Sequence, residues 1–505
     1  MFNTQTWQSH DKYQTRLDTV WKRLSRNRSK YQTDSYEKEK QKLINLNLNP
    51  VRDRLMQRYS HTGRPALHQD IILRSLILFV LLFNKTRAGT SLTSWVNSVL
   101  PDSAALQAII GCWSPEDLPP LGSYFDFMNR LWLGERDIYS RKKLFPARKN
   151  GKKPKKNIGP DGKLEEEDKL RTKILVEQIL DGKRISQNPE GILQDVFFLA
   201  AVLPSARSGL IPAENLTLSG DGTVVPSHTA HYGHEPRHPD EAATDGSPLE
   251  LRHYADPDAG WGWDSSKKAW YFGHTLYMLC CRNSELKIEL PLLMNYTEAR
   301  RHDSVNFLYA IDDFACHDTG ISPKNICLDS AHDNIPTYRL LKERGINALI
   351  DINGRSTKSE NYPDDISFDK QGKPLCRAGY KMIPWGNDPI KDAHKYRCPL
   401  KCGRIESCPC AAECVPEKKY GRTVYVKNEG DLRFHPAIPR DSQEYKDIYS
   451  ERTACERVNN RVLNNYQLQF LKIRGIDHFS FWTMLIGICI HLDARCKAAA
   501  LWAAS

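Results

Sequence analysis

The sequence predicts an α/β protein: a mixed β-sheet with flanking helices, an all-α N-terminal domain and a Cys-rich insertion. Three observations lead to this fold class. Three short apolar runs follow one another, as consecutive strands do, and a helix–strand alternation comes after them. Helical segments broken by Gly and Pro precede the sheet, and a stretch rich in Pro, Gly and Cys interrupts it. The predicted strands are 216–220, 269–280, 286–294, 325–328 and 346–352, with helices at 304–314 and 337–344.

Residues 1–140 are expected to form the helical N-terminal domain. Several short helices ahead of a sheet suit a DNA-binding domain of the helix-turn-helix type. Any small helical bundle has the same pattern, so the residues alone leave both interpretations open. The clearest helices are predicted at 67–83, 91–100, 103–110 and 123–133.

Positive charge is concentrated in one segment of the chain. The 505 residues include 72 Lys and Arg against 61 Asp and Glu, a net charge of +11. Residues 141–156 carry nine of these cations and no acid. We expect residues 141–172 to form a basic linker. It can contact the DNA backbone, and it can equally be a solvated connection between domains.

The polar N-terminus and the short apolar runs predict a cytoplasmic protein with no membrane partner. The N-terminus is polar and lacks the apolar core of a signal peptide. The most apolar run, 76–83, is far shorter than the ~20 residues that cross a bilayer. In the cytoplasm the 14 Cys are expected to stay reduced or to bind metal.

The most informative motif is Y-x2-R-x3-E, formed by Tyr449, Arg452 and Glu456. The segment is predicted to be helical, with Asp441 and Glu444 spaced as in a capping box at its start. Residues three and seven apart share one face of a helix, so the three motif side chains project together. A carboxylate beside a guanidinium suits metal and phosphate chemistry, because one ligates a hard cation and the other binds phosphate.

Two further carboxylates are predicted at strand ends. Asp221 and Asp329 each follow a short apolar run that is interpreted as a buried strand. Together with Glu456 they can converge on a pair of Mg²⁺ ions. Without such a site, Asp221 is a turn residue in Gly-Asp-Gly and Asp329 is a helix cap. Asp333 and Glu451 are the competing acids in each neighbourhood.

This order of acids resembles that of bacterial insertion-sequence transposases of the DDE type. Tyr449, Arg452 and Glu456 match a Y-x2-R-x3-E-x6-K signature of one large group, but Leu463 stands at its final basic position. Arg461 is the nearest cation and lies about 140° around the helix from Glu456. The resemblance covers most of residues 60–480. Other features typical of the group are Gly63-Arg64-Pro65, Trp270-Tyr-Phe-Gly-His274 and His302-Asp303-Ser304.

The resemblance implies a ribonuclease H-like catalytic core, made first by residues 173–352 and completed by residues 441–505. It implies that Asp221, Asp329 and Glu456 hold two Mg²⁺ or Mn²⁺ ions. Arg452 would orient a phosphate and Tyr449 would pack against the DNA backbone.

The same resemblance implies a transposase acting on double-stranded DNA. It would cut at the terminal inverted repeats of its element and join the ends to target DNA, as a homodimer assembled on that DNA. One alternative is a nuclease with the same core that does not join strands. The other is a domesticated, non-catalytic DNA-binding protein, against which the intact set of three acids argues.

A Cys-rich insertion is predicted at residues 353–440. Five thiols lie within 17 residues, and four of them suffice for a structural zinc ion. The alternative is a loop of free thiols. The chosen ligands are Cys398, Cys402, Cys408 and Cys414, with Cys410 to spare.

Overall fold

The structure is a computed structural model of the chain. It describes residues 1–82, 91–132, 144–146, 171–185, 191–234, 251–317, 320–353, 365–369, 372–391, 393–414, 419–427, 432–434 and 436–503. All nine cations of residues 141–156, in the predicted basic linker, lie outside these residues.

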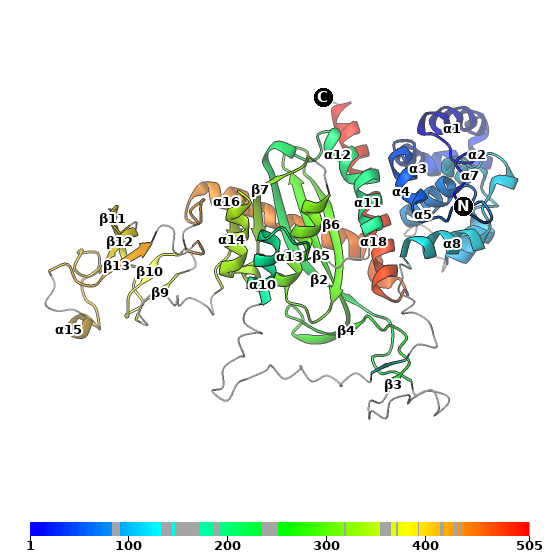
Figure 1. Ribbon diagram of the computed structural model, residues 1–505. Helices are drawn as coiled ribbons and strands as arrows, with labels where there is room; N and C mark the ends of the chain where they lie inside the picture. Colours follow the sequence, from blue (N-terminus) through cyan, green and yellow to red (C-terminus); the bar gives the residue numbers. More distant parts are fainter. Residues whose placement is uncertain are drawn as a thin grey trace.

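The N-terminal region is helical, as predicted (Figure 1). Its central helix, α5 (Gln69–Leu82), is predominantly apolar and is buried along all of its 14 residues. The two charges in it, Asp70 and Arg74, form a fully buried ion pair of 2.8 Å. Around α5 lie α1 (His10–Leu24), α2 (Arg28–Tyr31), α3 (Thr33–Ile44), α4 (Asn49–Met56), α6 (Leu92–Ser94), α7 (Ala104–Ile110) and α8 (Leu121–Trp132).

A six-stranded mixed sheet occupies the middle of the molecule and confirms the predicted mixed α/β fold. The strand order is β4-β5-β2-β7-β8, with β6 also paired to β5. β5 pairs antiparallel with β2, β4 and β6, whereas β7 runs parallel to β2 and β8. The strands are β2 (Leu216–Pro226), β4 (Gly260–Asp264), β5 (Ala269–Asn283), β6 (Ile288–Glu298), β7 (Pro323–Leu328) and β8 (Asn347–Ile350). A separate two-stranded pair joins β1 (Phe145–Pro146) to β3 (Leu251–Arg252).

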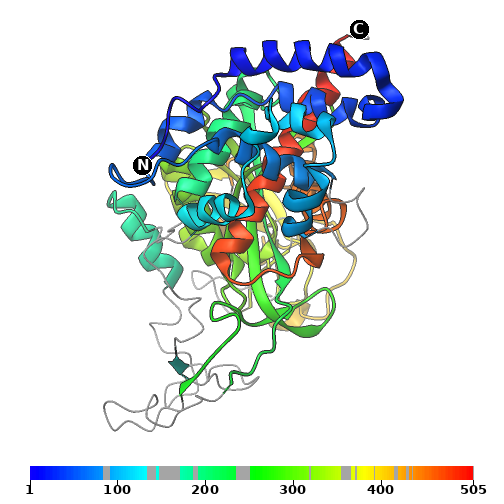
Figure 2. The ribbon, with the colours of Figure 1, turned by 90° about the vertical axis from the view of Figure 1, so that its right-hand side faces the viewer.

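Helices cover the sheet and connect it to the N-terminal region. α18 (Ile476–Trp502) lies between the sheet and the N-terminal helices (Figures 1 and 2). It contacts both: the buried His491 binds the Pro291 carbonyl in β6 at 2.8 Å, and the Cys489 thiol donates to the Ile77 carbonyl in α5 at 3.7 Å. The other flanking helices are α10 (Arg171–Leu180), α11 (Gly191–Phe197), α12 (Leu203–Arg207), α13 (Asp303–Cys316) and α14 (Ile335–Glu343).

The helix predicted around the Y-x2-R-x3-E motif is present but changes its winding. It consists of α16 (Gln443–Tyr449), a 3₁₀ turn (Ser450–Arg452), α17 (Thr453–Asn460) and a π turn (Arg461–Asn465). The predicted capping box was wrong, because Ser442 caps α16 with its side chain. Asp441 instead forms an ion pair with Lys373 at 2.8 Å.

The segment after β8 forms a small β-rich region at one end of the molecule (Figure 1). It has its own buried cluster, which includes Phe368, Met382, Val426 and Phe434. Its elements are β9 (Ser367–Phe368), β10 (Pro374–Leu375), β11 (Ile383–Asp388), β12 (Ala393–Arg397), α15 (Ala411–Cys414) and β13 (Thr423–Lys427). None of the helices that the structure describes has the length and apolar character needed to cross a membrane.

Candidate active site

The strand register brings Asp221 and Asp329 together. β2 and β7 are paired in parallel up to Ser219 and Cys327, and each aspartate comes two residues later along the chain. The prediction that Asp221 ends its strand was wrong. β2 continues to Pro226 against β5, with Asp221 opposite Met278, while β7 stops at Leu328. Asp221 therefore lies in a strand interior, beside the place where the parallel neighbour ends.

The glycines on both sides of Asp221 serve close packing rather than a turn. A Cβ atom on Gly220 would lie 2.7 Å from both the Tyr277 hydroxyl and a Leu328 methyl group. A Cβ atom on Gly222 would collide with the carboxylate of Asp303. Both positions thus leave room for side chains that surround Asp221.

Asp329 is fixed in direction by two donors. It is the N-cap of a 3₁₀ turn, and its Oδ1 accepts from the Ala331 N–H at 3.1 Å and lies 2.6 Å from His332 Nδ1. Burial alone would raise the pKa of Asp329. The His332 hydrogen bond and charge, the Ala331 N–H and the Arg452 charge outweigh burial and lower that pKa below its ordinary value. Asp329 therefore caps the turn, as expected, and the hydrogen bonds of this cap favour its ionised carboxylate.

A third aspartate, Asp303, completes a carboxylate cluster with Asp221 and Asp329. It starts helix α13, directly after the N-cap His302. Burial is the largest cause that raises the pKa of Asp221, to about 7, and the charges of Asp303 and Asp329 add to it. The pKa of Asp303 is raised as well, mainly by burial. Carboxylates that repel one another in this way are suited to a bound cation.

Glu456 lies on the helix side of the site and is held by Arg452. The Arg452 guanidinium contacts the Glu456 carboxylate at 2.9 Å, and the Glu456 side chain is 50% exposed. The charge of Arg452 also acts on Asp221 and Asp329, lowering the pKa of each. From the same helix, Asn459 approaches Asp221 with its amide nitrogen 3.5 Å from Oδ2. Arg452 is thus the cation that lies among all three predicted acids.

Tyr449 is turned into the protein. Its hydroxyl donates to the carbonyl of Leu328, the last residue of β7, at 3.1 Å. Its ring stacks on Tyr445 with centroids 5.4 Å apart. This placement ties the helix to the strand that ends just before Asp329, and contact of Tyr449 with DNA stays a prediction.

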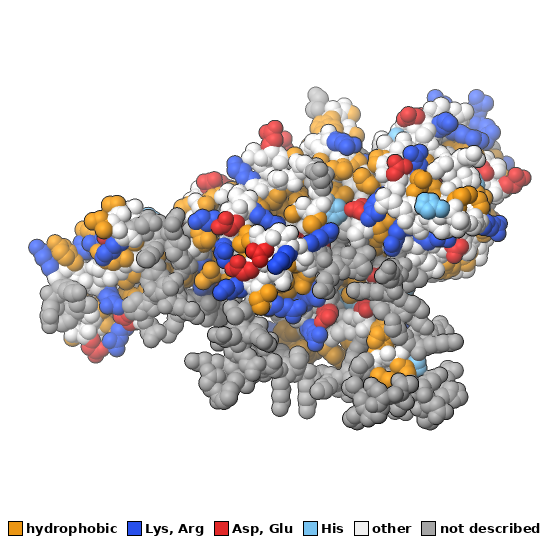
Figure 3. Space-filling model, viewed as in Figure 1, with side chains coloured by type: hydrophobic (Ala, Val, Ile, Leu, Met, Phe, Trp, Pro, Cys, Tyr) orange, Lys and Arg blue, Asp and Glu red, His pale blue; other side chains and the backbone are white. Residues whose placement is uncertain are grey.

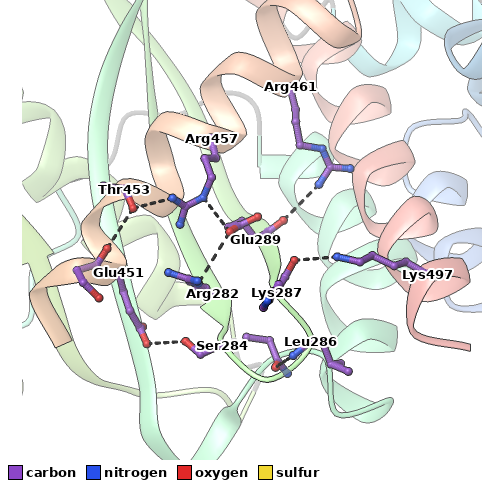
Figure 4. A network of polar contacts seen from close by, with 12 residues as sticks. Arg282, Ser284, Leu286, Lys287, Glu289, Glu451, Thr453, Arg457, Arg461 and Lys497 are labelled. Carbon is purple, nitrogen blue, oxygen red and sulfur yellow. Dashed lines mark hydrogen bonds and ion pairs between the residues drawn. The ribbon is translucent and has the colours of Figure 1, made fainter. Parts of the chain in front are cut away.

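The competing acids point elsewhere. Asp333 has a fully buried side chain and forms a two-pronged ion pair with Arg433, at 2.7 and 2.6 Å. Glu451 accepts from the Ser284 hydroxyl at 3.3 Å, on the side of the helix that faces the β5–β6 hairpin (Figure 4).

The same hairpin binds the cations that follow Glu456. Arg457 pairs with Glu289 at 2.8 Å, and Arg461 reaches the Glu289 carbonyl at 3.5 Å (Figure 4). Arg461 also pairs with Asp493 at 3.4 Å. Leu463, at the basic position of the signature, is partly buried against the main core. The Arg461 side chain therefore makes its contacts within the protein, as its angular position on the helix predicted.

The side chains fit a hard divalent cation, although they do not form a complete cage. Carboxylate oxygens are the preferred ligands of such ions, and the charge of Asp329 acts on the carboxyl group of Asp221. Across the described segments, no three His, Cys, Asp or Glu side chains gather closely enough to hold one ion. In particular, the Glu456 carboxylate forms an ion pair with Arg452 and is not part of a group of three metal ligands among the described residues.

The predicted zinc ligands are also not gathered. Cys398, Cys402, Cys408 and Cys414 are partly exposed free thiols in the structure. Two of them close turns of the backbone: the Cys402 N–H donates to the Cys398 carbonyl, and the Cys414 N–H donates to the Cys410 carbonyl. The thiols whose charges act on Cys414 are Cys398 and Cys376, and Cys376 was not among the predicted ligands.

Three residues of the site were missed in the sequence. Asp303 was noticed only as part of a typical motif, while His332 and Tyr277 carried no signal of their own. The Asp-x2-His spacing was the available clue to His332, because a 3₁₀ turn brings residues three apart together.

One protein family matches the part of the chain that contains these residues. The family described as "Transposase DDE domain" matches residues 221–492, more than half of the chain, and the protein belongs to that family. The match begins at Asp221 and ends within α18. Membership implies that the protein binds DNA and uses a divalent metal ion, typically Mg²⁺.

A short similarity to a different kind of protein was also found. A thiazole synthase from Geobacter metallireducens is 24% identical over 104 residues. That stretch covers 21% of this chain and 36% of the synthase, so the chain spans about a third of that relative's length.

Proposed function

We propose that the protein is a transposase that cuts DNA at the ends of its own element and joins those ends to target DNA. The observation that carries the proposal is the register of β2 and β7, which sets Asp221 beside Asp329 under the helix of Glu456. The strand order, in which β2, β5 and β6 are antiparallel neighbours and β7 and β8 follow β2 in parallel, supports a ribonuclease H-like core. Residues 221–492 of the family match contain all three acids.

In this proposal Asp221, Asp329 and Glu456 hold two Mg²⁺ or Mn²⁺ ions. When bound, such a pair activates water or a 3′-hydroxyl and stabilises the leaving oxygen of a phosphodiester. Asp329 is held ionised and oriented by its hydrogen bonds. Arg452, which neutralises Glu456 in the free protein, is placed to move onto a substrate phosphate once Glu456 takes a metal.

The remaining DNA contacts are proposed from charge and family. Lys and Arg side chains are spread over the N-terminal helices and the middle of the molecule on the face shown in Figure 3. We infer that the N-terminal helices and the basic linker bind the terminal inverted repeats, and that two copies assemble on the DNA. The Cys-rich insertion is proposed to carry a structural zinc, which requires its thiols to close around the ion.

The experiment uses a duplex made from the DNA that flanks the gene, incubated with the purified protein and Mg²⁺ or Mn²⁺. Asp221→Asn, Asp329→Asn and Glu456→Gln should each abolish cleavage and leave DNA binding intact. Glu451→Gln is the matched control, since it removes an acid from the other side of the same helix. Retained cleavage in Asp221→Asn would overturn the assignment of the site.

Strand transfer is measured separately, with a pre-cut end and a supercoiled target plasmid. Joined products support the transposase. Cleavage without joining identifies instead a nuclease with the same core. DNA binding with neither reaction identifies a non-catalytic protein.

A further inference from the structure

A buried chain of hydrogen bonds leads away from Asp329. His332 lies in the 3₁₀ turn after β7 and has no exposed surface. Its Nδ1 lies 2.6 Å from Asp329 Oδ1, and its Nε2 lies 2.8 Å from the hydroxyl of Tyr277. Tyr277 is itself fully buried on β5, opposite Gly222 of β2. The chain therefore links the carboxylate to a neighbouring strand of the sheet.

The chemistry of the partners fixes the direction of these bonds. An ionised carboxylate can only accept, so the ring must donate its Nδ1–H to Asp329. Whenever the ring is neutral, Nε2 is then an acceptor and the Tyr277 O–H donates to it, whereas a protonated ring still donates Nδ1–H to Asp329. Tyr277 remains a donor because burial, the largest cause, raises its pKa well above the ordinary value. The two bonds thus select one tautomer and one ring orientation.

The position of Tyr277 is fixed from the opposite side as well. The Gly220 backbone leaves the space for its hydroxyl, since a Cβ there would lie 2.7 Å from that oxygen. The rings of Tyr277 and Phe307 pack against the His332 ring, each with its centroid 5.9 Å away. Both ring nitrogens of His332 are hydrogen-bonded and two aromatic rings pack against it, so the orientation of the His332 ring is fixed.

We propose that His332 is a positioning residue for the metal-binding carboxylate, with Tyr277 holding its tautomer. The proposal rests on the proposed function, in which Asp329 ligates the metal. By occupying Oδ1 of Asp329, His332 fixes the plane of the carboxylate and leaves Oδ2 for the ion. Loss of such a supporting hydrogen bond typically weakens metal affinity about 10–100-fold.

Metal binding is measured without DNA, as free Mn²⁺ in a titration followed by electron paramagnetic resonance. His332→Leu cannot donate and should weaken Mn²⁺ binding by about 10–100-fold. His332→Asn keeps an N–H near the Nδ1 position and should stay within a few-fold of the parent protein. Tyr277→Phe frees the tautomer and should fall between these two. Excess Mn²⁺ should restore cleavage by His332→Leu, which it would not do for a variant that has merely lost its structure.

The outcomes separate this inference from the proposed function. In one outcome Asp329→Asn loses Mn²⁺ binding, while Tyr277→Phe, His332→Asn and His332→Leu all bind Mn²⁺ as the parent protein does. His332 then does not position the ligand. If Asp329→Asn itself binds Mn²⁺ normally, the metal site is elsewhere and the proposed function fails first. Should His332→Leu not fold, unchanged Mn²⁺ binding by Tyr277→Phe overturns the inference by itself.

Discussion

The raised pKa of Asp221 predicts that this carboxylate destabilises the metal-free protein. Its ordinary pKa is 3.8 and its pKa in the folded chain is about 7, with burial as the main cause, followed by Asp303 and Asp329. The folded state therefore binds this proton more tightly than the unfolded chain does. Stability falls as the pH rises from about 4 towards 7, and the loss is complete above pH 7. At 1.36 kcal/mol per pKa unit, the loss is at most about 4 kcal/mol.

Asp221→Asn removes this effect while keeping the shape of the side chain. In EDTA, urea unfolding followed by tryptophan fluorescence should show the variant more stable by only about 1 kcal/mol at pH 4.5, where the loss has just begun. At pH 8 the variant should be more stable by about 2–4 kcal/mol, the upper end being the full pKa difference. Added Mg²⁺ should stabilise the parent protein at pH 8 and the variant much less, because binding to the folded state alone raises stability.

Asp333→Asn provides the control with the opposite sign. Asp333 is buried against Arg433, so removing its charge should destabilise the protein by about 3–5 kcal/mol at pH 8. The reasoning is refuted if Asp221→Asn is less stable than the parent in EDTA at pH 8. It is refuted too if the difference between them does not change with pH.

Three other changes test separate parts of the site. Gly222→Ala should displace Asp303, lower the melting temperature by an amount equivalent to about 1–3 kcal/mol and reduce metal-dependent cleavage, both measured on the purified variant. Tyr449→Phe should cost about 1 kcal/mol in urea unfolding by losing its bond to the Leu328 carbonyl, and it should retain more cleavage than a variant lacking Glu456. Metal analysis of protein purified without chelator should find about one zinc ion per chain. If no zinc is found, the thiols of residues 398–414 are free, as they are in the structure.

β4 was not among the predicted strands, but the order of the other five strands of the sheet could be predicted from the sequence, because apolar runs and Gly or Pro breaks are local signals. The length of β2 could not. Gly220 and Gly222 indicated a turn, yet the strand continues because β5 is long enough to pair with it as far as Pro226. Which strand supplies that partner is decided by tertiary contacts.

The acids were predictable to different extents. Asp329 was separated from Asp333 only by the assumption that β7 ends at Leu328, which the structure confirms. Their different environments depend on Arg433, which lies 100 residues further along the chain. Asp303 depends equally on a distant contact, since it reaches the site only because α13 begins beside Gly222.

The Gly-Asp-Gly sequence is best explained by what lies around Asp221. A strand interior disfavours glycine, which contributes no side chain to the packing of the sheet. Here the missing side chains admit the Tyr277 hydroxyl on one side and the Asp303 carboxylate on the other. Through Tyr277 the first glycine supports the hydrogen bonds that orient Asp329, and through Asp303 the second places a negative charge near Asp221 that raises the pKa of Asp221. The two glycines are thus part of the arrangement that makes the site electrostatically costly without a cation and ready to receive one.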